Sequence, residues 1–118
     1  MKNFLAIYLG NPNSARQKEW QALDEAKRQA RITAGMQAWG AWMAQHKEAL
    51  VVEGGPLGKT KRTSEAGVAD TSNNMGGFVV VRAETQDAAA RMFLNHPHFT
   101  IFPGDSVEIM ECMPIPGR

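Results

Sequence analysis

Two histidines and an aspartate near the end of the chain are the residues best suited to acid–base chemistry. His96 and His98 flank a proline, and Asp105 follows in the next turn. An imidazole titrates near neutral pH, and a neighbouring carboxylate fixes its tautomer and raises its basicity. The spacing predicts His98 as a general acid–base, with Asp105 orienting it and His96 beside them. A structural alternative stays open, in which His96 caps a helix C-terminus and Asp105 bonds within its own turn.

A second candidate site consists of apolar side chains that could line a ligand pocket. Met36, Trp39, Trp42 and Met43 recur at helical spacing. Aromatic and thioether groups suit small apolar ligands, although such a stripe more often packs only into a core. The two interpretations are compatible, because a barrel closed by two sheets commonly leaves a cavity beside its helix.

A short basic run lies further along the chain. Lys59, Lys61 and Arg62 could bind an anionic group of a substrate, and we include Lys59 and Arg62 in the predicted ligand pocket. The alternative is that these charges lie on an exposed hairpin and are only solvated.

The residue types argue against a bound cofactor or metal. The glycine-rich segment 54–60 is similar to a phosphate-binding loop, but Pro56 lacks an N–H donor and a strand pattern follows instead of a helix. His96 and His98 offer at most two metal ligands, and no cysteine or carboxylate cluster supplies a third. We expect no cofactor and no metal.

Length and composition indicate one domain, residues 1–118, with enough apolar residues for a core. Hydrophobic residues make up 43% of the chain, and 13 basic residues balance 12 acidic ones to a net charge of +1. This balance gives no electrostatic case for nucleic acid or a membrane surface as a partner. The single cysteine, Cys112, suits a reducing compartment, and the apolar segment 4–9 is too short for a leader or a membrane span. We expect a cytoplasmic protein.

The elements that must position these residues alternate between strand and helix. Ser14 and Thr85 are suited to cap helices, and residues 33–35 predict a break that separates two helical stretches before residue 50. Gly40, inside the second stretch, predicts a close approach of another backbone. A helix over 85–95 ends at Pro97. Strands are expected at residues 3–9, 50–53, 78–81 and 107–113, with residues 54–56 as a corner and a small hairpin over 59–64 and 68–71.

This order predicts an α+β fold with a ferredoxin-like split βαβ sheet and helices on one face. Residues 4–9 and 78–81 are apolar at every position, so both faces of the sheet require burial. The helices cover only one face, and a monomer rarely leaves such a patch in water. We therefore expect a homodimer that packs sheet face to sheet face.

Several segments together resemble a known family. They are residues 40–43, 52–60, 76–81, 96–98 and 106–111, which span nearly the whole chain in order. In this combination the sequence resembles the YCII-related domain family. The resemblance implies a ferredoxin-like domain that dimerises into an α+β barrel. Most members have no established activity, some relatives are enzymes of lactone or aromatic degradation, and some domains lie beside transcription regulators.

The sequence departs from that family at its site. Typical members carry a histidine in the helix before the Gly-Pro corner, whereas Ala38 and Trp39 occupy the corresponding positions here. The Asp-Gly-Pro-Phe signature of one branch is replaced by residues 54–57, which read Gly-Gly-Pro-Leu. We therefore favour a small-molecule-binding dimer without a demonstrated activity. The alternative is an enzyme that acts on a small lactone or an aromatic-degradation intermediate by His/Asp acid–base chemistry.

Overall fold

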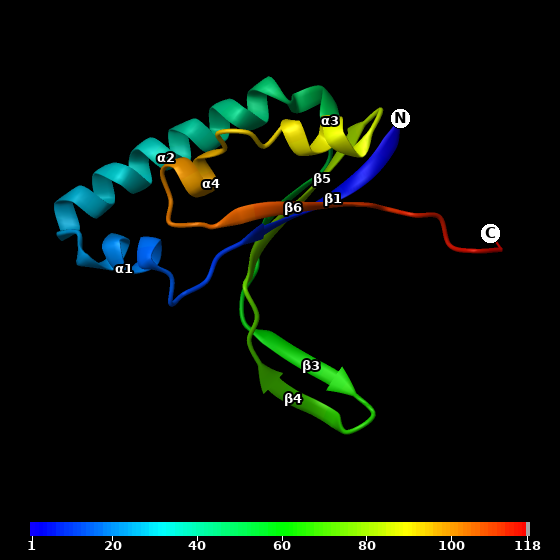
Figure 1. Cartoon of the computed structure of the whole chain (residues 1–118), viewed down its shortest axis with the longest axis horizontal. Helices are drawn as coiled ribbons and strands as arrows, with labels where there is room; N and C mark the ends of the chain where they lie inside the picture. Colours follow the sequence, from blue (N-terminus) through cyan, green and yellow to red (C-terminus); the bar gives the residue numbers. More distant parts are fainter. Residues whose placement is uncertain (118) are drawn as a thin grey trace.

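The computed structural model describes residues 1–117, which fold around one antiparallel sheet (Figure 1). Its four strands lie in the order β2-β5-β1-β6. These strands are β1 (Lys2–Leu9), β2 (Leu50–Pro56), β5 (Met75–Ala83) and β6 (Ser106–Glu111). Strand β5 is antiparallel to both β1 and β2, so β1 and β2 run parallel with β5 between them. This interleaved order is that of a split βαβ sheet.

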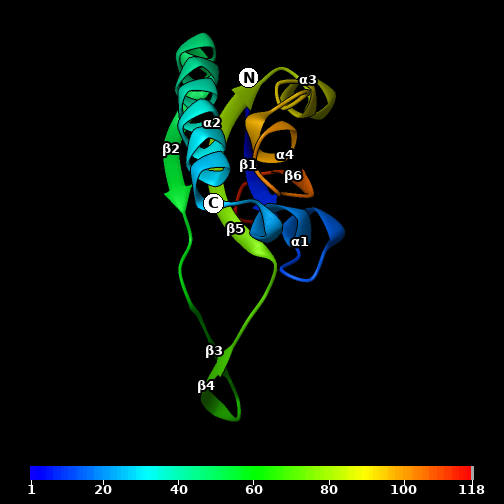
Figure 2. The ribbon, with the colours of Figure 1, turned by 90° about the vertical axis from the view of Figure 1, so that its left-hand side faces the viewer.

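The helices connect parallel strands across one face of the sheet. Helices α1 (Ala15–Ala22) and α2 (Glu25–Gln45), followed by the 3-10 turn η1 (Lys47–Ala49), join β1 to β2. Helices α3 (Gln86–Arg91) and α4 (Pro97–Thr100) join β5 to β6. Figures 1 and 2 show all of them on the same side of the sheet. The predicted α+β, ferredoxin-like fold is therefore confirmed.

The helix boundaries differ from the prediction at two points. Helix α3 ends at Arg91, and Pro97, which was predicted to end it, begins α4. Helix α2 runs without interruption through residues 33–35, and the break lies earlier, where Leu23 is extended and Asp24 caps α2 by accepting the Lys27 N–H at 2.8 Å. Gly35 is buried against the Phe102 ring, where a β-carbon would overlap it. This glycine therefore allows close packing and does not end the helix. Ser14 caps α1 as predicted, accepting the Gln17 N–H at 3.1 Å.

Two other glycines differ in whether another segment of the chain lies close to them. The prediction that Gly40 admits a neighbouring backbone is wrong, because no atom lies within 4 Å of the position of a β-carbon there. Gly54, in contrast, has φ +69° and lies against the Phe78 carbonyl, so only glycine fits. Strand β2 continues through residues 54–56, which were predicted to form a corner, and its register against β5 is irregular there.

The core lies between the sheet and the helices. Alternate residues of the two central strands point into it, in keeping with the period of a strand. The buried apolar residues are Phe4, Ala6, Tyr8, Trp42, Val79, Val81, Ala83, Ala89 and Phe93.

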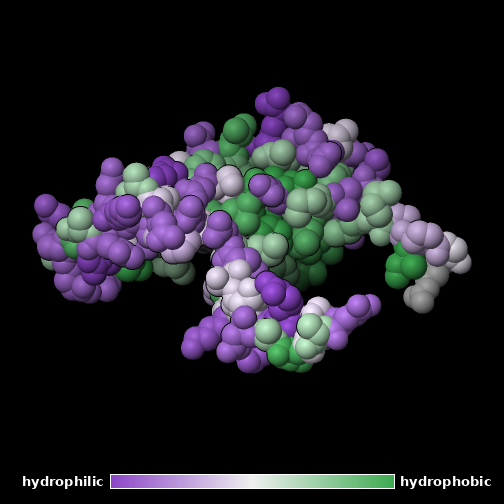
Figure 3. Space-filling view, turned by 60° about the horizontal axis from the view of Figure 1, so that its bottom comes forward, coloured by the Kyte–Doolittle hydropathy of each residue, from purple (hydrophilic) through white to green (hydrophobic). Residues whose placement is uncertain are grey.

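The opposite face of the sheet carries no helix. Leu5, Ile7, Phe78 and Val80 are half-buried there, and Val52 is 46% exposed. Figure 3 shows a hydrophobic surface over the central part of this side of the molecule.

Strands β3 (Thr60–Ser64) and β4 (Gly67–Thr71) form a separate two-stranded sheet that projects from the body (Figures 1 and 2). The predicted hairpin is thereby confirmed. Within residues 1–117, no helix is both long enough and apolar enough to cross a membrane.

Candidate functional site

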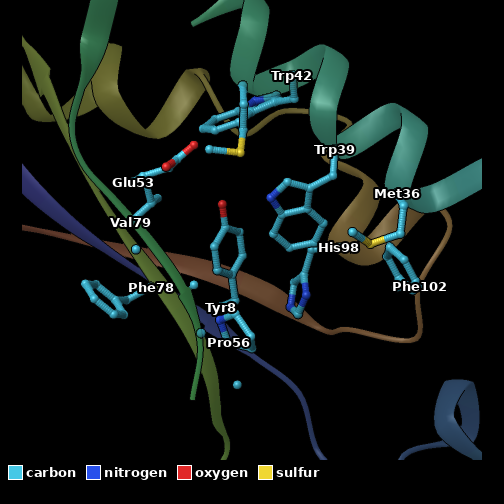
Figure 4. A pocket seen from close by; sticks show the side chains of 15 residues that line it. Tyr8, Met36, Trp39, Trp42, Glu53, Pro56, Phe78, Val79, His98 and Phe102 are labelled. Carbon is cyan, nitrogen blue, oxygen red and sulfur yellow. The ribbon is translucent and has the colours of Figure 1, made fainter. Parts of the chain in front are cut away.

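A pocket of about 490 Å³ lies between α2 and the helix-facing side of the sheet. Its wall is almost entirely apolar and aromatic, and Glu53 and His98 are its ionisable members apart from the Tyr8 phenol (Figure 4). The residues that line it are Tyr8, Met36, Trp39, Trp42, Met43, Glu53, Gly54, Gly55, Pro56, Gly76, Gly77, Phe78, Val79, His98 and Phe102. This volume falls within the usual range for small-molecule sites, roughly 300–1,000 Å³.

Helix α2 supplies one wall of the pocket through residues that the sequence singled out. Met36, Trp39, Trp42 and Met43 all line the cavity. Trp42 also belongs to the core, because its indole Nε1–H donates to the Met92 carbonyl at 2.8 Å. The stripe on this helix thus serves packing and pocket together, and its role in ligand binding stays a prediction.

His96 lies behind this wall, completely buried among aromatic rings. Its ring centroid is 4.5 Å from that of Trp39, 4.8 Å from that of Trp42 and 5.1 Å from that of Tyr8. Its Nδ1 accepts the backbone N–H of His98 at 3.0 Å and so caps the start of α4. The predicted cap at the end of the preceding helix is therefore wrong, because the chain turns at Asn95 in a left-handed conformation before α4 begins.

The cap fixes the tautomer of His96. Because Nδ1 accepts a hydrogen bond, the neutral ring carries its proton on Nε2, which lies 3.3 Å from the Tyr8 hydroxyl oxygen. Burial, followed by the charges of His98 and His46, lowers the pKa of His96 from 6.5 to about 3. His96 is therefore neutral at physiological pH and donates to Tyr8.

Tyr8 and Glu53 are polar members of the pocket wall that sequence reasoning missed. Tyr8 is only 5% exposed, and burial raises the pKa of its phenol well above the ordinary value of 10.0. Glu53 comes from β2, and Figure 4 shows its carboxylate and the Tyr8 hydroxyl both turned towards the cavity. The alternation of strand 3–9 could have placed Tyr8 on the same face as Phe4 and Ala6. No comparable signal marks Glu53.

His98 contributes to the pocket wall from α4. Its Nε2 lies 2.8 Å from the Leu9 carbonyl oxygen, so this nitrogen carries a proton and donates it. The ring lies flat against Gly104, where any side chain would overlap it. Burial lowers the pKa of His98, and the Leu9 and Ser106 carbonyls and the Asp105 charge oppose that effect.

The predicted partnership of His98 with Asp105 takes a different form in the structure. The Asp105 carboxylate accepts the backbone N–H of Asn11 at 2.7 Å, and no hydrogen bond joins it to His98 within residues 1–117. Asp105 therefore holds the loop after β1 and acts on His98 through its charge alone. The histidines and the aspartate lie in one region, but not as a hydrogen-bonded catalytic chain.

The two basic residues predicted for the pocket lie elsewhere. Lys59 is exposed just before β3, and Arg62 donates to the Thr71 hydroxyl at 3.1 Å within the projecting hairpin. Neither residue is part of the pocket wall. In the described part of the chain, no three histidine, cysteine or acidic side chains are grouped so that they could hold a metal ion.

Comparison with known proteins finds a likeness among solved structures. No family model matches the chain, and no curated protein matches it either. Among solved structures, the chain is similar to the 5-chloro-2-hydroxyhydroquinone dehydrochlorinase TftG from Burkholderia phenoliruptrix, determined in complex with 2,5-dihydroxybenzoquinone. The identity is 21% and the TM-score is 0.54, over 92% of this chain and 90% of that one. This likeness supports the α+β fold.

The neutral state of buried His96 makes stability depend on pH. In the unfolded chain this ring takes up a proton below about 6.5, whereas in the folded protein it does so only near 3. The unfolded state binds more protons between these values, so the free energy of unfolding falls as pH decreases through this window. One such group contributes a slope of at most about 1.4 kcal/mol per pH unit.

The variant His96→Asn keeps an oxygen that can cap α4 but does not titrate. We expect its free energy of unfolding, measured by urea denaturation across the same window, to fall less steeply with decreasing pH than that of the wild type. Equal slopes for the two proteins would show that His96 is not held neutral by the fold.

Proposed function

We propose that this protein is a YCII-like, small-molecule-binding homodimer whose ligand is a small aromatic or lactone metabolite. The observation that carries the proposal is the pocket beside α2, whose wall combines aromatic and thioether side chains with few polar groups. Such a surface favours flat apolar compounds, because their transfer from water is favourable and ring–ring contacts add to it. The exposed free thiol of Cys112 suits the cytoplasm, where we place the protein.

The structural likeness supports the same class of ligand. The TftG structure contains 2,5-dihydroxybenzoquinone, a small ring compound, on a fold similar to that of this chain. The binding role proposed here does not require the reaction of that enzyme. It requires only that the same fold can enclose a small ring.

An enzymatic role is the second candidate, and the position of His98 favours it. The imidazole lies in the pocket wall, where it could exchange a proton with a bound lactone or aromatic intermediate. The hydrogen bond from His98 to Leu9 and the engagement of Asp105 with Asn11 weigh against it, since both side chains already serve the backbone.

The proposed dimer follows from the helix-free face of the sheet. Val52, Val80, Leu5 and Met110 form one row across all four strands, as the strand registers show. Val52 and Met110 at the two ends are 46% and 42% exposed. A second copy of the chain could bury this row against its own, because the surface is apolar and carries no covering element.

Removal of a pocket ring tests the binding proposal. A thermal-shift screen of small aromatic compounds and lactones, coumarin among them, is expected to find ligands that raise the melting temperature. For such a ligand we expect Trp39→Ala to weaken binding about tenfold, measured by titration calorimetry, because a lost ring contact costs about 1.5 kcal/mol.

The matched control is Trp20→Ala, since Trp20 lies on α1, does not itself line the pocket and contacts the pocket wall through Phe102. Equal losses in both variants would contradict the proposed site. The ligand should be recovered unchanged, and its consumption by the wild type but not by His98→Gln would favour the enzymatic candidate.

A charge on the helix-free face tests the dimer. We expect Val52→Lys to raise the dimer dissociation constant at least tenfold in sedimentation experiments, because burying an unpaired ammonium is costly. The control Gln37→Lys adds the same charge to an exposed position of α2. A wild type that stays monomeric at high concentration would refute the dimer.

A further inference from the structure

The hydrogen bond between His96 and Tyr8 determines whether the Tyr8 hydroxyl donates a hydrogen bond to a ligand in the pocket or accepts one from it. A phenol oxygen accepts hydrogen bonds and its single proton donates one. Here the oxygen accepts from Nε2–H of His96, because Nδ1 of that ring is occupied by the His98 N–H. Within residues 1–117, the Tyr8 proton has no acceptor, and the hydroxyl is turned towards the cavity (Figure 4). Tyr8 therefore presents a donor to whatever fills the pocket.

Glu53 supplies a hydrogen-bond acceptor to the same pocket. Its carboxylate lines the same pocket and takes part in no salt bridge within the part of the chain that the structure describes. Glu53 is an exposed residue, so its carboxylate stays hydrated in the absence of a ligand. Because an ionised carboxylate only accepts hydrogen bonds, a ligand group that pairs with it must carry a proton. The pocket thus presents one fixed donor and one acceptor in an otherwise apolar wall.

The charge of the pocket argues against an anionic ligand. Within residues 1–117, no lysine or arginine lines it. Of the two basic residues expected there, Lys59 lies just before β3 and Arg62 lies in the hairpin. An aromatic carboxylate would lose its hydration without gaining a cationic partner, and it would meet the like charge of Glu53.

We propose that the pocket selects hydroxylated aromatic compounds that carry no negative charge, with Tyr8 donating to a ring oxygen and Glu53 accepting from a ring hydroxyl. This inference rests on the proposed function and names its ligand class more narrowly. His96 is a positioning residue in it, because it acts through Tyr8 and does not contact the ligand. A ligand that offers only carboxylate oxygens satisfies Tyr8 but repels Glu53.

Three probes that share one ring distinguish the possible charges. They are hydroquinone, which is neutral, 4-hydroxybenzoate, which is an anion, and tyramine, which is a cation. For the wild-type protein we expect calorimetry to show that hydroquinone binds at least tenfold tighter than 4-hydroxybenzoate. We expect tyramine, whose ammonium can pair with Glu53, to bind tighter than 4-hydroxybenzoate as well. This ranking needs no variant, so it does not depend on the folding of any mutant.

Two conservative variants test whether Tyr8 and Glu53 cause this order of affinities. Tyr8→Phe keeps the ring and removes the hydroxyl, and it should weaken hydroquinone binding about threefold to tenfold, the usual effect of one hydrogen bond. Glu53→Gln keeps the shape and removes the charge, and it should raise the relative affinity for 4-hydroxybenzoate. Glu48→Gln, a change at an exposed acid outside the pocket, should leave all three affinities unchanged.

The outcomes separate this inference from the proposed function. Equal affinities for hydroquinone and 4-hydroxybenzoate, tighter binding of the anion, or unchanged hydroquinone binding by Tyr8→Phe would overturn only the inference. Failure of every aromatic and lactone probe to bind, neutral rings without hydroxyls included, would overturn the binding proposal together with it.

Discussion

A neutral imidazole buried among aromatic rings connects the fold of this protein to its pocket. His96 is fully buried and is shared by two elements, since Nδ1 caps α4 and Nε2 lies at the Tyr8 hydroxyl of β1. A protonated ring could not accept the His98 N–H, so the cap requires the neutral form. The same requirement aims the Tyr8 proton at the cavity. One protonation state thus supports the start of a helix, the packing of a core and the polarity of the pocket wall.

The two faces of the sheet differ in what covers them. On the helix side, Phe4, Ala6 and Tyr8 alternate into the core, and Tyr8 reaches the pocket at the end of that series. On the other side, Leu5 and Ile7 belong to an apolar surface with no covering helix (Figure 3). The pocket lies within a single chain, between α2 and the sheet, so the proposed ligand binding and the proposed pairing of sheets use opposite faces. A substitution on one face of the sheet therefore makes no direct contact with the opposite face.

The sequence predicted the elements that local chemistry determines. Apolar strands and the caps Ser14 and Thr85 led to the split βαβ order, and the apolar stripe of α2 indicated residues that do line the pocket. At Gly35 the local sequence led to a wrong prediction. The glycine indicated a break in the helix, whereas in the structure it allows close packing of the Phe102 ring.

The arrangement of the polar groups around the pocket could not be predicted from the sequence. Tyr8, Glu53 and His96 come from three distant segments, and only the sheet register and the turn at Asn95 bring them to one region. Asp105 illustrates the same limit. Because it lies close to His98 in the sequence, we predicted that the two side chains interact, but the Asp105 carboxylate accepts a hydrogen bond from Asn11 in the loop after β1.

The protonation of His96 can be measured directly by nitrogen NMR of the ring. The structure predicts a protonated Nε2 and an unprotonated Nδ1, with shifts that do not change from about pH 8 to about pH 5 in the folded protein. Titration of this ring near the ordinary value of 6.5, or a proton on Nδ1, would contradict the arrangement that directs Tyr8 into the pocket.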